Sequence, residues 1–164
     1  MPMMVKMLHE AGMPLDLVYM VSAESNFNVR ARSKKSAVGL WQFIASTGRI
    51  YGLKINRWID ERRDPLLSTK AAITYLKHLY GIFGDWESSM AAYNTGEGRV
   101  KRAIKLAKRK GQKHNYSSLR LPRETRNYVP AIMALSVIYK NPERYGFGHV
   151  KKMQPMDETQ GNLP

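Results

Sequence analysis

The sequence contains no cysteine. A disulfide framework and a zinc site built on thiolates are therefore excluded. The four histidines, His9, His78, His114 and His149, are scattered, and none belongs to an HExxH motif or to a pair with ligand spacing. We therefore expect no metal site and no other cofactor.

Long apolar runs are also missing. No segment approaches the roughly 20 apolar residues of a transmembrane helix. The first residues, MPMMVKMLHEAGMP, are interrupted by Lys6, His9 and Glu10, so they lack the continuous apolar core of a signal peptide. The sequence is expected to hold neither a membrane span nor a targeting segment.

Acidic residues are scarce. Thirteen Asp and Glu stand against 27 Lys and Arg, which gives a formal net charge of +14. A surface of this sign attracts polyanions, most strongly at low salt. Nucleic acid is one candidate partner, and a bacterial cell wall, whose peptide stems carry carboxylates, is another. Charge alone does not choose between them.

The composition that remains is that of one folded domain. The chain has 164 residues, of which 43% are hydrophobic and 24% charged, enough for a single core. Apolar residues recur at spacings of three and four, with Gly and Pro between the segments, which predicts a mainly α fold. We expect one domain over residues 1–150 and a disordered tail over 151–164, where no periodicity remains.

Prolines and capping residues predict where the helices begin. The sequence indicates a helix after Pro14, a long helix after Asp64-Pro65, a helix capped by Asp85, a basic helix from Glu97 to Lys110, and a last helix from Pro122 to before Pro142. The buried face of the long helix is expected to carry Leu66, Ile73, Leu76, Tyr80 and Phe83.

The region between the first two of these helices is harder to interpret. A polar loop is expected over 28–36, a short helix around 39–44 that buries Trp41 and Phe43, and a turn over 46–52. Acidic residues at 60, 61 and 64 alternate with Arg57, Arg62 and Arg63, which predicts a salt-bridged surface turn.

Glu24 continues an apolar stripe. Leu17, Met20 and Val21 share one helix face, and a further step of three residues reaches Glu24. Burial disfavours a charged carboxylate and raises its pKa, which suits a general acid. The alternative is that Glu24 turns to solvent at a helix end or pairs with Arg30 or Arg32, and Glu24 considered without other motifs favours that alternative.

Five sequence blocks point further. They are ESNFN from Glu24 with Ser33 after it, GLWQF at 39–43, STGRIYGL at 46–53, AAYNTGEGRV at 91–100 and LPRETRNYVP at 121–130. In this order and spacing they resemble the lytic murein transglycosylases with a goose-type-lysozyme-like fold, most closely the membrane-bound D type. The resemblance covers about residues 12–148 and departs from the family at Val29 and Ala45, where Pro is common.

This resemblance implies a mainly α, lysozyme-like domain in which Glu24 is the only catalytic carboxylate. It places Ser33 near the cleaved bond and puts Gln42, Tyr93, Asn94, Glu124 and Tyr128 along the cleft. Read without the resemblance, Tyr93 and Tyr128 are ordinary packed aromatics, and Glu124 is an acid that favours the start of its helix.

The implied reaction cleaves the bond between N-acetylmuramic acid and N-acetylglucosamine without water and leaves 1,6-anhydromuramic acid ends. The resemblance implies that the protein binds the peptidoglycan strand and works in the periplasm or cell envelope. No specific binding of nucleic acid is expected, and a monomer is favoured. Two alternatives stay open: a hydrolytic muramidase on the same fold, and a non-catalytic basic module that binds the wall or nucleic acid.

Overall fold

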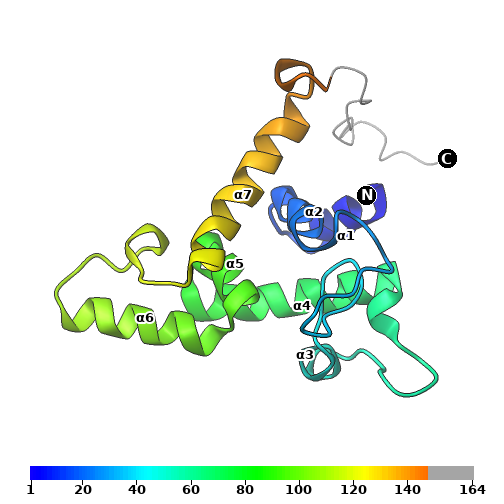
Figure 1. Ribbon diagram of the computed structural model, residues 1–164, viewed down its shortest axis with the longest axis horizontal. Helices are drawn as coiled ribbons and strands as arrows, with labels where there is room; N and C mark the ends of the chain where they lie inside the picture. Colours follow the sequence, from blue (N-terminus) through cyan, green and yellow to red (C-terminus); the bar gives the residue numbers. More distant parts are fainter. Residues whose placement is uncertain (148–164) are drawn as a thin grey trace.

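The computed structural model describes residues 1–147, and over that range the chain is mainly α, as predicted (Figure 1). Its helices are α1 (Pro2–Glu10), α2 (Tyr19–Ser25), α3 (Ala45–Ile50), α4 (Pro65–Phe83), α5 (Trp86–Thr95), α6 (Glu97–Arg109) and α7 (Arg123–Lys140), with single 3-10 turns between some of them. The tail predicted from residue 151 lies outside the described residues.

The predicted caps set the helix starts. The Asp64 side chain accepts a hydrogen bond from the backbone N–H of Leu67 at 2.8 Å, and Asp85 accepts one from Ser88 at 2.7 Å. Each bond satisfies an amide that the first turn of a helix leaves unpaired. Helices α4 and α5 therefore begin where the sequence indicated.

The buried face of α4 differs from the predicted one. Leu76 is buried, but Leu66 and Tyr80 are 52% and 39% exposed. Small side chains occupy much of the inner face instead, among them Ser68, Thr69, Ala71 and Ala72. Thr69 explains part of this choice, because its hydroxyl oxygen accepts a hydrogen bond from the buried indole N–H of Trp41 at 2.9 Å. A larger apolar residue at this position would leave that N–H unpaired.

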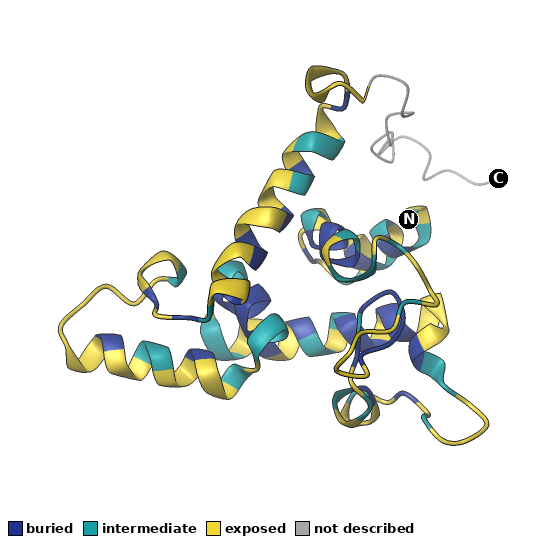
Figure 2. Ribbon diagram, viewed as in Figure 1, coloured by how far each residue is buried: buried dark blue, intermediate teal, exposed yellow. Residues whose placement is uncertain are grey.

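The core lies where the inner faces of α2, α4, α5 and α7 meet (Figure 2). Trp41 and Phe43 belong to it, with exposed fractions of 0% and 2%, as predicted. The segment after Pro14 begins as a 3-10 turn, Leu15–Val18, and becomes α-helical only at Tyr19. Its apolar stripe is buried all the same, so the end of α2 is directed toward the interior.

The prediction of a short helix around 39–44 is wrong. The chain there makes a tight loop with antiparallel bridges between Arg32 and Val38 and between Val38 and Phe43. Gly39 has φ +82°, and a Cβ on it would collide with the backbone carbonyl of Arg62. This close approach requires glycine and an irregular backbone. The turn predicted over 46–52 is likewise wrong, because Ala45–Ile50 forms α3.

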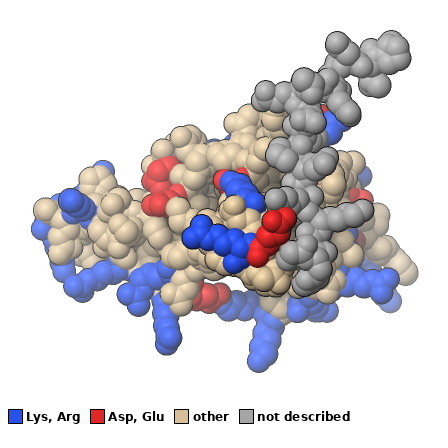
Figure 3. Space-filling view, turned by 90° about the horizontal axis from the view of Figure 1, so that it is seen from above, with Lys and Arg blue, Asp and Glu red and all other residues tan. Residues whose placement is uncertain are grey.

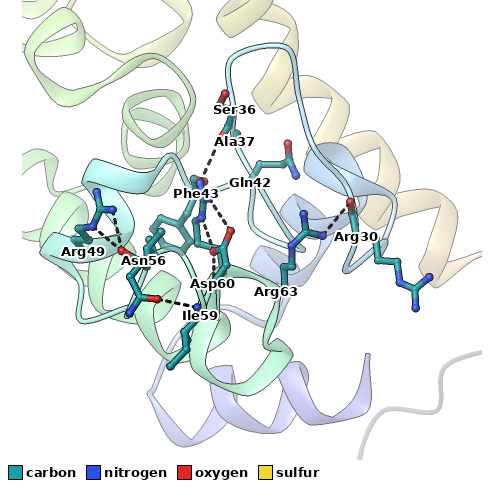
Figure 4. A network of polar contacts seen from close by, with 12 residues as sticks. Arg30, Ser36, Ala37, Gln42, Phe43, Arg49, Asn56, Ile59, Asp60 and Arg63 are labelled. Carbon is teal, nitrogen blue, oxygen red and sulfur yellow. Dashed lines mark hydrogen bonds and ion pairs between the residues drawn. The ribbon is translucent and has the colours of Figure 1, made fainter.

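The salt-bridged turn is present, but it is not confined to the surface. Arg62 is only 8% exposed, and it lies 2.8 Å from Asp60. Its guanidinium also donates to the carbonyl oxygens of Ser36 and Phe43, both at 3.1 Å. Hydrogen bonds from Arg62 lower the pKa of Asp60, so the pair stays ionised. The pair thus fixes the loop that precedes α3, and Figure 4 shows Asp60 close to Phe43 of this loop.

Candidate active site

A cavity of about 830 Å³ opens beside the end of α2. The loop 33–44, α3, α4, the end of α5 and the start of α7 contribute its other walls. All seven residues singled out from the sequence line it: Glu24, Ser33, Gln42, Tyr93, Asn94, Glu124 and Tyr128. The fold therefore brings together side chains that lie far apart in the sequence.

Glu24 is partly buried in this cavity. The hydroxyl of Tyr128 donates a hydrogen bond of 2.6 Å to its Oε1 atom. Burial raises the pKa of Glu24 from 4.5 to about 7; the Tyr128 hydrogen bond opposes this rise and the charge of Glu124 adds to it. Near neutral pH the carboxyl group is therefore present in both protonation states, as a group that both gives and takes a proton requires.

The alternative for Glu24, an ion pair with Arg30 or Arg32, is wrong. Neither arginine is buried, and within residues 1–147 Glu24 has no ion-pair partner. The helix does end there, because Asn26 adopts a left-handed conformation with φ +48°. Glu24 nevertheless points along the stripe into the cavity.

Ser25, the residue after Glu24, ties the end of α2 to a neighbouring loop, a contact that the sequence analysis missed. Its hydroxyl lies 2.8 Å from the carbonyl oxygen of Leu40 and 3.1 Å from that of Val21, and it can donate to either. The first contact ties the last turn of α2 to the loop 33–44, which contributes another wall of the cavity. The only available signal was its position directly after Glu24.

Ser33 and Gln42 present free hydrogen-bonding capacity. The Ser33 oxygen accepts from the N–H of Ala37 at 3.1 Å, which leaves its hydroxyl hydrogen available. The Gln42 amide nitrogen donates to the carbonyl oxygen of Gly39 at 2.8 Å, so its oxygen is left to accept. That bond also offsets the strain of Gln42, whose φ is +48°.

Asn94 is fixed from α7. The buried hydroxyl of Thr125 donates to its Oδ1 atom at 2.8 Å. The amide hydrogens of Asn94 have no partner among the described residues and remain available as donors on the cavity wall. Amide groups of this kind suit the hydroxyl and N-acetyl oxygens of a sugar.

Tyr75 and Tyr93, whose rings lie side by side, form another part of the wall. Tyr93 donates from its hydroxyl to the carbonyl oxygen of Trp41 at 2.7 Å, and its ring lies 5.1 Å from that of Tyr75. Tyr75 in turn stacks on Tyr51 at 4.5 Å. Burial raises the pKa of Tyr75 to about 12, so this phenol stays neutral. Tyr75 lines the cavity but carried no sequence signal beyond its place in a helix.

The cavity has few other charges. Glu124 is a second lining carboxylate, whereas Asp60 and Asp64 are not among the lining residues. The Glu124 side chain is 73% exposed and lies 3.9 Å from the Lys35 ammonium. Lys34 and Lys35 also line the cavity, and neither was singled out from the sequence. Over residues 1–147, no three His, Cys, Asp or Glu side chains are grouped as a metal site would need.

The sequence matches known proteins over most of its length. The family model described as the transglycosylase SLT domain matches residues 4–116. The membrane-bound lytic murein transglycosylase D of Escherichia coli is 50% identical over 136 residues, which are 82% of this chain and 30% of that protein. Peptidoglycan transglycosylase gp16 of Escherichia phage T7 is 36% identical over 121 residues, which are 72% of this chain and 9% of that protein.

A solved structure supports the fold. An inactive mutant of the lytic transglycosylase Slt from Pseudomonas aeruginosa superimposes with a TM-score of 0.66 at 23% identity, covering 88% of this chain and 24% of that one. The chain thus spans about a third or less of the length of these relatives. The extent of the family match and the identity to the Escherichia coli protein lead to one conclusion: the chain belongs to the transglycosylase SLT domain family.

Proposed function

We propose that this chain is a lytic transglycosylase domain that cleaves peptidoglycan between N-acetylmuramic acid and N-acetylglucosamine. The observation that carries the proposal is Glu24, a partly buried carboxyl group with a pKa raised to about 7 in a cavity of about 830 Å³. Relatives named as murein and peptidoglycan transglycosylases support the choice of substrate.

In the first step, protonated Glu24 gives its proton to the glycosidic oxygen as the bond to C1 of the muramic residue breaks. The N-acetyl oxygen of the substrate assists the departure, so one acid suffices. In the second step, the Glu24 carboxylate takes the proton of the muramic C6 hydroxyl, whose oxygen bonds to C1. The ring closes as a 1,6-anhydro sugar, no water is consumed, and Glu24 is again protonated.

Tyr128 acts on both steps through Glu24. Its hydrogen bond to Oε1 orients the carboxyl group and stabilises the charged form that exists between the two proton transfers. Ser33, Gln42 and Asn94 supply the hydrogen-bonding groups that fix the sugars. The tyrosine wall gives the apolar faces of the rings a packing surface.

Glu124 keeps a muramidase as the second candidate, because it is the other carboxylate lining the cavity. A hydrolytic mechanism needs a base that activates water. Glu124 is mostly exposed and forms an ion pair with Lys35, so it is poorly placed to activate a water. The competing nucleophile, the C6 hydroxyl, is part of the reacting sugar itself. An intramolecular attacker has a large effective concentration, which favours the anhydro product.

We infer that the domain works in the periplasm or cell envelope, where peptidoglycan lies. The Escherichia coli relative is described as membrane-bound. Within residues 1–147, none of the helices has the length and apolar character needed to cross a membrane.

The test is the mass of muropeptides released from purified peptidoglycan. Anhydro products lack one water and resist borohydride, and they are the expected main product. Reducible products of full mass would identify a muramidase, and binding without release would identify a non-catalytic module. Glu24→Gln is the control; it should lower the rate by about 10²- to 10⁴-fold or more, since it removes the only proposed acid and base.

A further inference from the structure

Two lysines at the mouth of the cavity have no part in the proposed mechanism. Lys34 and Lys35 lie side by side in the loop 28–36, line the cavity, and are exposed. Lys35 is 3.9 Å from Glu124, and Lys34 has no ion-pair partner among the described residues. The chain has other lysines on its surface, but those of α6 do not line this cavity.

The loop that carries both lysines is held firmly at its base. The backbone N–H of Ser33 donates to the carbonyl oxygen of Ala37 at 2.9 Å, and that of Ser36 donates to the carbonyl oxygen of Ser33 at 3.0 Å. The buried guanidinium of Arg62 donates a hydrogen bond to the carbonyl oxygen of Ser36 at 3.1 Å. The backbone therefore presents Lys34 and Lys35 at a defined edge of the cavity, although their own side chains are long.

The contact between Lys35 and Glu124 places a carboxylate beside the lysines at the edge of the cavity. It places a carboxylate of α7 opposite the lysine loop, across the mouth of the cavity. The lysine and glutamate side chains are 85% and 73% exposed, so water screens the pair and it is weak. Another carboxylate can replace Glu124 beside Lys35, or bind Lys34 directly.

We propose that Lys34 and Lys35 form a binding site for carboxylates of the peptide stems attached to the glycan strand. This inference rests on the proposed function, because a strand seated at Glu24 brings its stems to the cavity edge. The sugars of an intact strand are neutral, since the lactyl group of muramic acid is joined to the stem by an amide. The stems carry the carboxylates, the same chemical group that Glu124 supplies in the free protein.

Equilibrium binding tests the site without requiring cleavage. The probe is a soluble glycan strand with uncross-linked stems, used either native or with its carboxylates converted to methylamides, and the protein carries Glu24→Gln so that the strand stays intact. We expect the native strand to bind about three- to tenfold more tightly than the amidated strand, the range of one or two exposed ion pairs. Adding Lys34→Ala and Lys35→Ala should remove most of this difference.

Two further variants separate a site from general attraction by a cationic surface. Lys34→Arg with Lys35→Arg keeps both charges and should keep the preference for the native strand. Lys105→Ala with Lys108→Ala removes the same charge from α6, which gathers basic side chains at one end of the molecule (Figure 3), and should also keep it.

Equal binding of the native and amidated strands by the Glu24→Gln protein with both lysines intact would overturn the proposal. An equal loss of preference in the variants that lack Lys34 with Lys35 and Lys105 with Lys108 would also overturn it. Persistence of the preference without Lys34 and Lys35 would do the same. Cleavage by the unmodified chain is measured separately. A chain that discriminates between the strands but releases no product would refute the proposed function and leave the carboxylate site standing.

Discussion

Glu24→Gln should stabilise the fold at neutral pH while it removes the proposed acid and base. In the folded chain the pKa of Glu24 is raised from 4.5 to about 7, mainly by burial. The folded state therefore holds this proton more tightly than the unfolded state does. Stability from Glu24 is complete below about pH 4.5 and is lost as the pH rises toward 7, because the unfolded chain ionises first.

The size of the effect follows from the pKa values of the folded and unfolded chains. Each tenfold difference between the two acid dissociation constants corresponds to about 1.4 kcal/mol, so a rise in pKa from 4.5 to about 7 corresponds to about 3 kcal/mol at pH 8. Gln has the volume of Glu, carries no charge and can still accept the hydrogen bond from Tyr128. Its stabilisation relative to the parent should be near zero at about pH 4 and approach about 3 kcal/mol at about pH 8.

Urea unfolding of both proteins at several pH values measures this difference directly. Tyr128→Phe, studied in parallel, shows whether the hydrogen bond contributes. A difference between Glu24→Gln and the parent that is independent of pH, or that shrinks as the pH rises from about 4 to about 8, would refute the reasoning. Either result would mean that Glu24 is not desolvated in the folded chain.

Three further predictions concern residues around the site. Tyr128→Phe removes a hydrogen bond that lowers the pKa of Glu24, so the alkaline limb of the pH–rate profile should move to higher pH; a move to lower pH would contradict this. Arg62→Ala should cost about 2–4 kcal/mol in urea unfolding, because it leaves Asp60 and two carbonyls without their donor; Arg62→Lys should recover part of it. Gly39→Ala should cost at least about 2 kcal/mol by the same assay, since it forces Cβ against the Arg62 carbonyl. A cost below about 1 kcal/mol would mean that the loop relaxes easily.

The helix starts at α4 and α5 could be predicted because they depend on local chemistry. A side-chain oxygen before the first turn caps its own helix, whatever the rest of the chain does. The part of the stripe from Met20 to Glu24 was readable for the same reason, since these residues lie in α2 and spacing along one helix decides which residues share a face.

The loop before α3 could not be predicted, because its shape depends on distant residues. Gly39 meets the backbone of Arg62, and Arg62 reaches back to Ser36 and Phe43. The pattern GLWQF by itself predicts a short helix, and only the contact of Gly39 with the Arg62 backbone shows that it forms a loop. Similarly, only the fold shows that Tyr75 lines the cavity and that Lys35 faces Glu124.

The contact between Glu24 and Tyr128 has a consequence for how the site forms during synthesis. The two residues are separated by 104 positions, and α7, which carries Tyr128, is the last α-helix in the described part of the chain. A ribosome adding about 5–20 residues per second produces the acid about 5–20 s before the phenol that orients it. A growing chain thus carries the Glu24 carboxyl group without its hydrogen-bond partner, and the site is complete only after α7 has been synthesised and has docked.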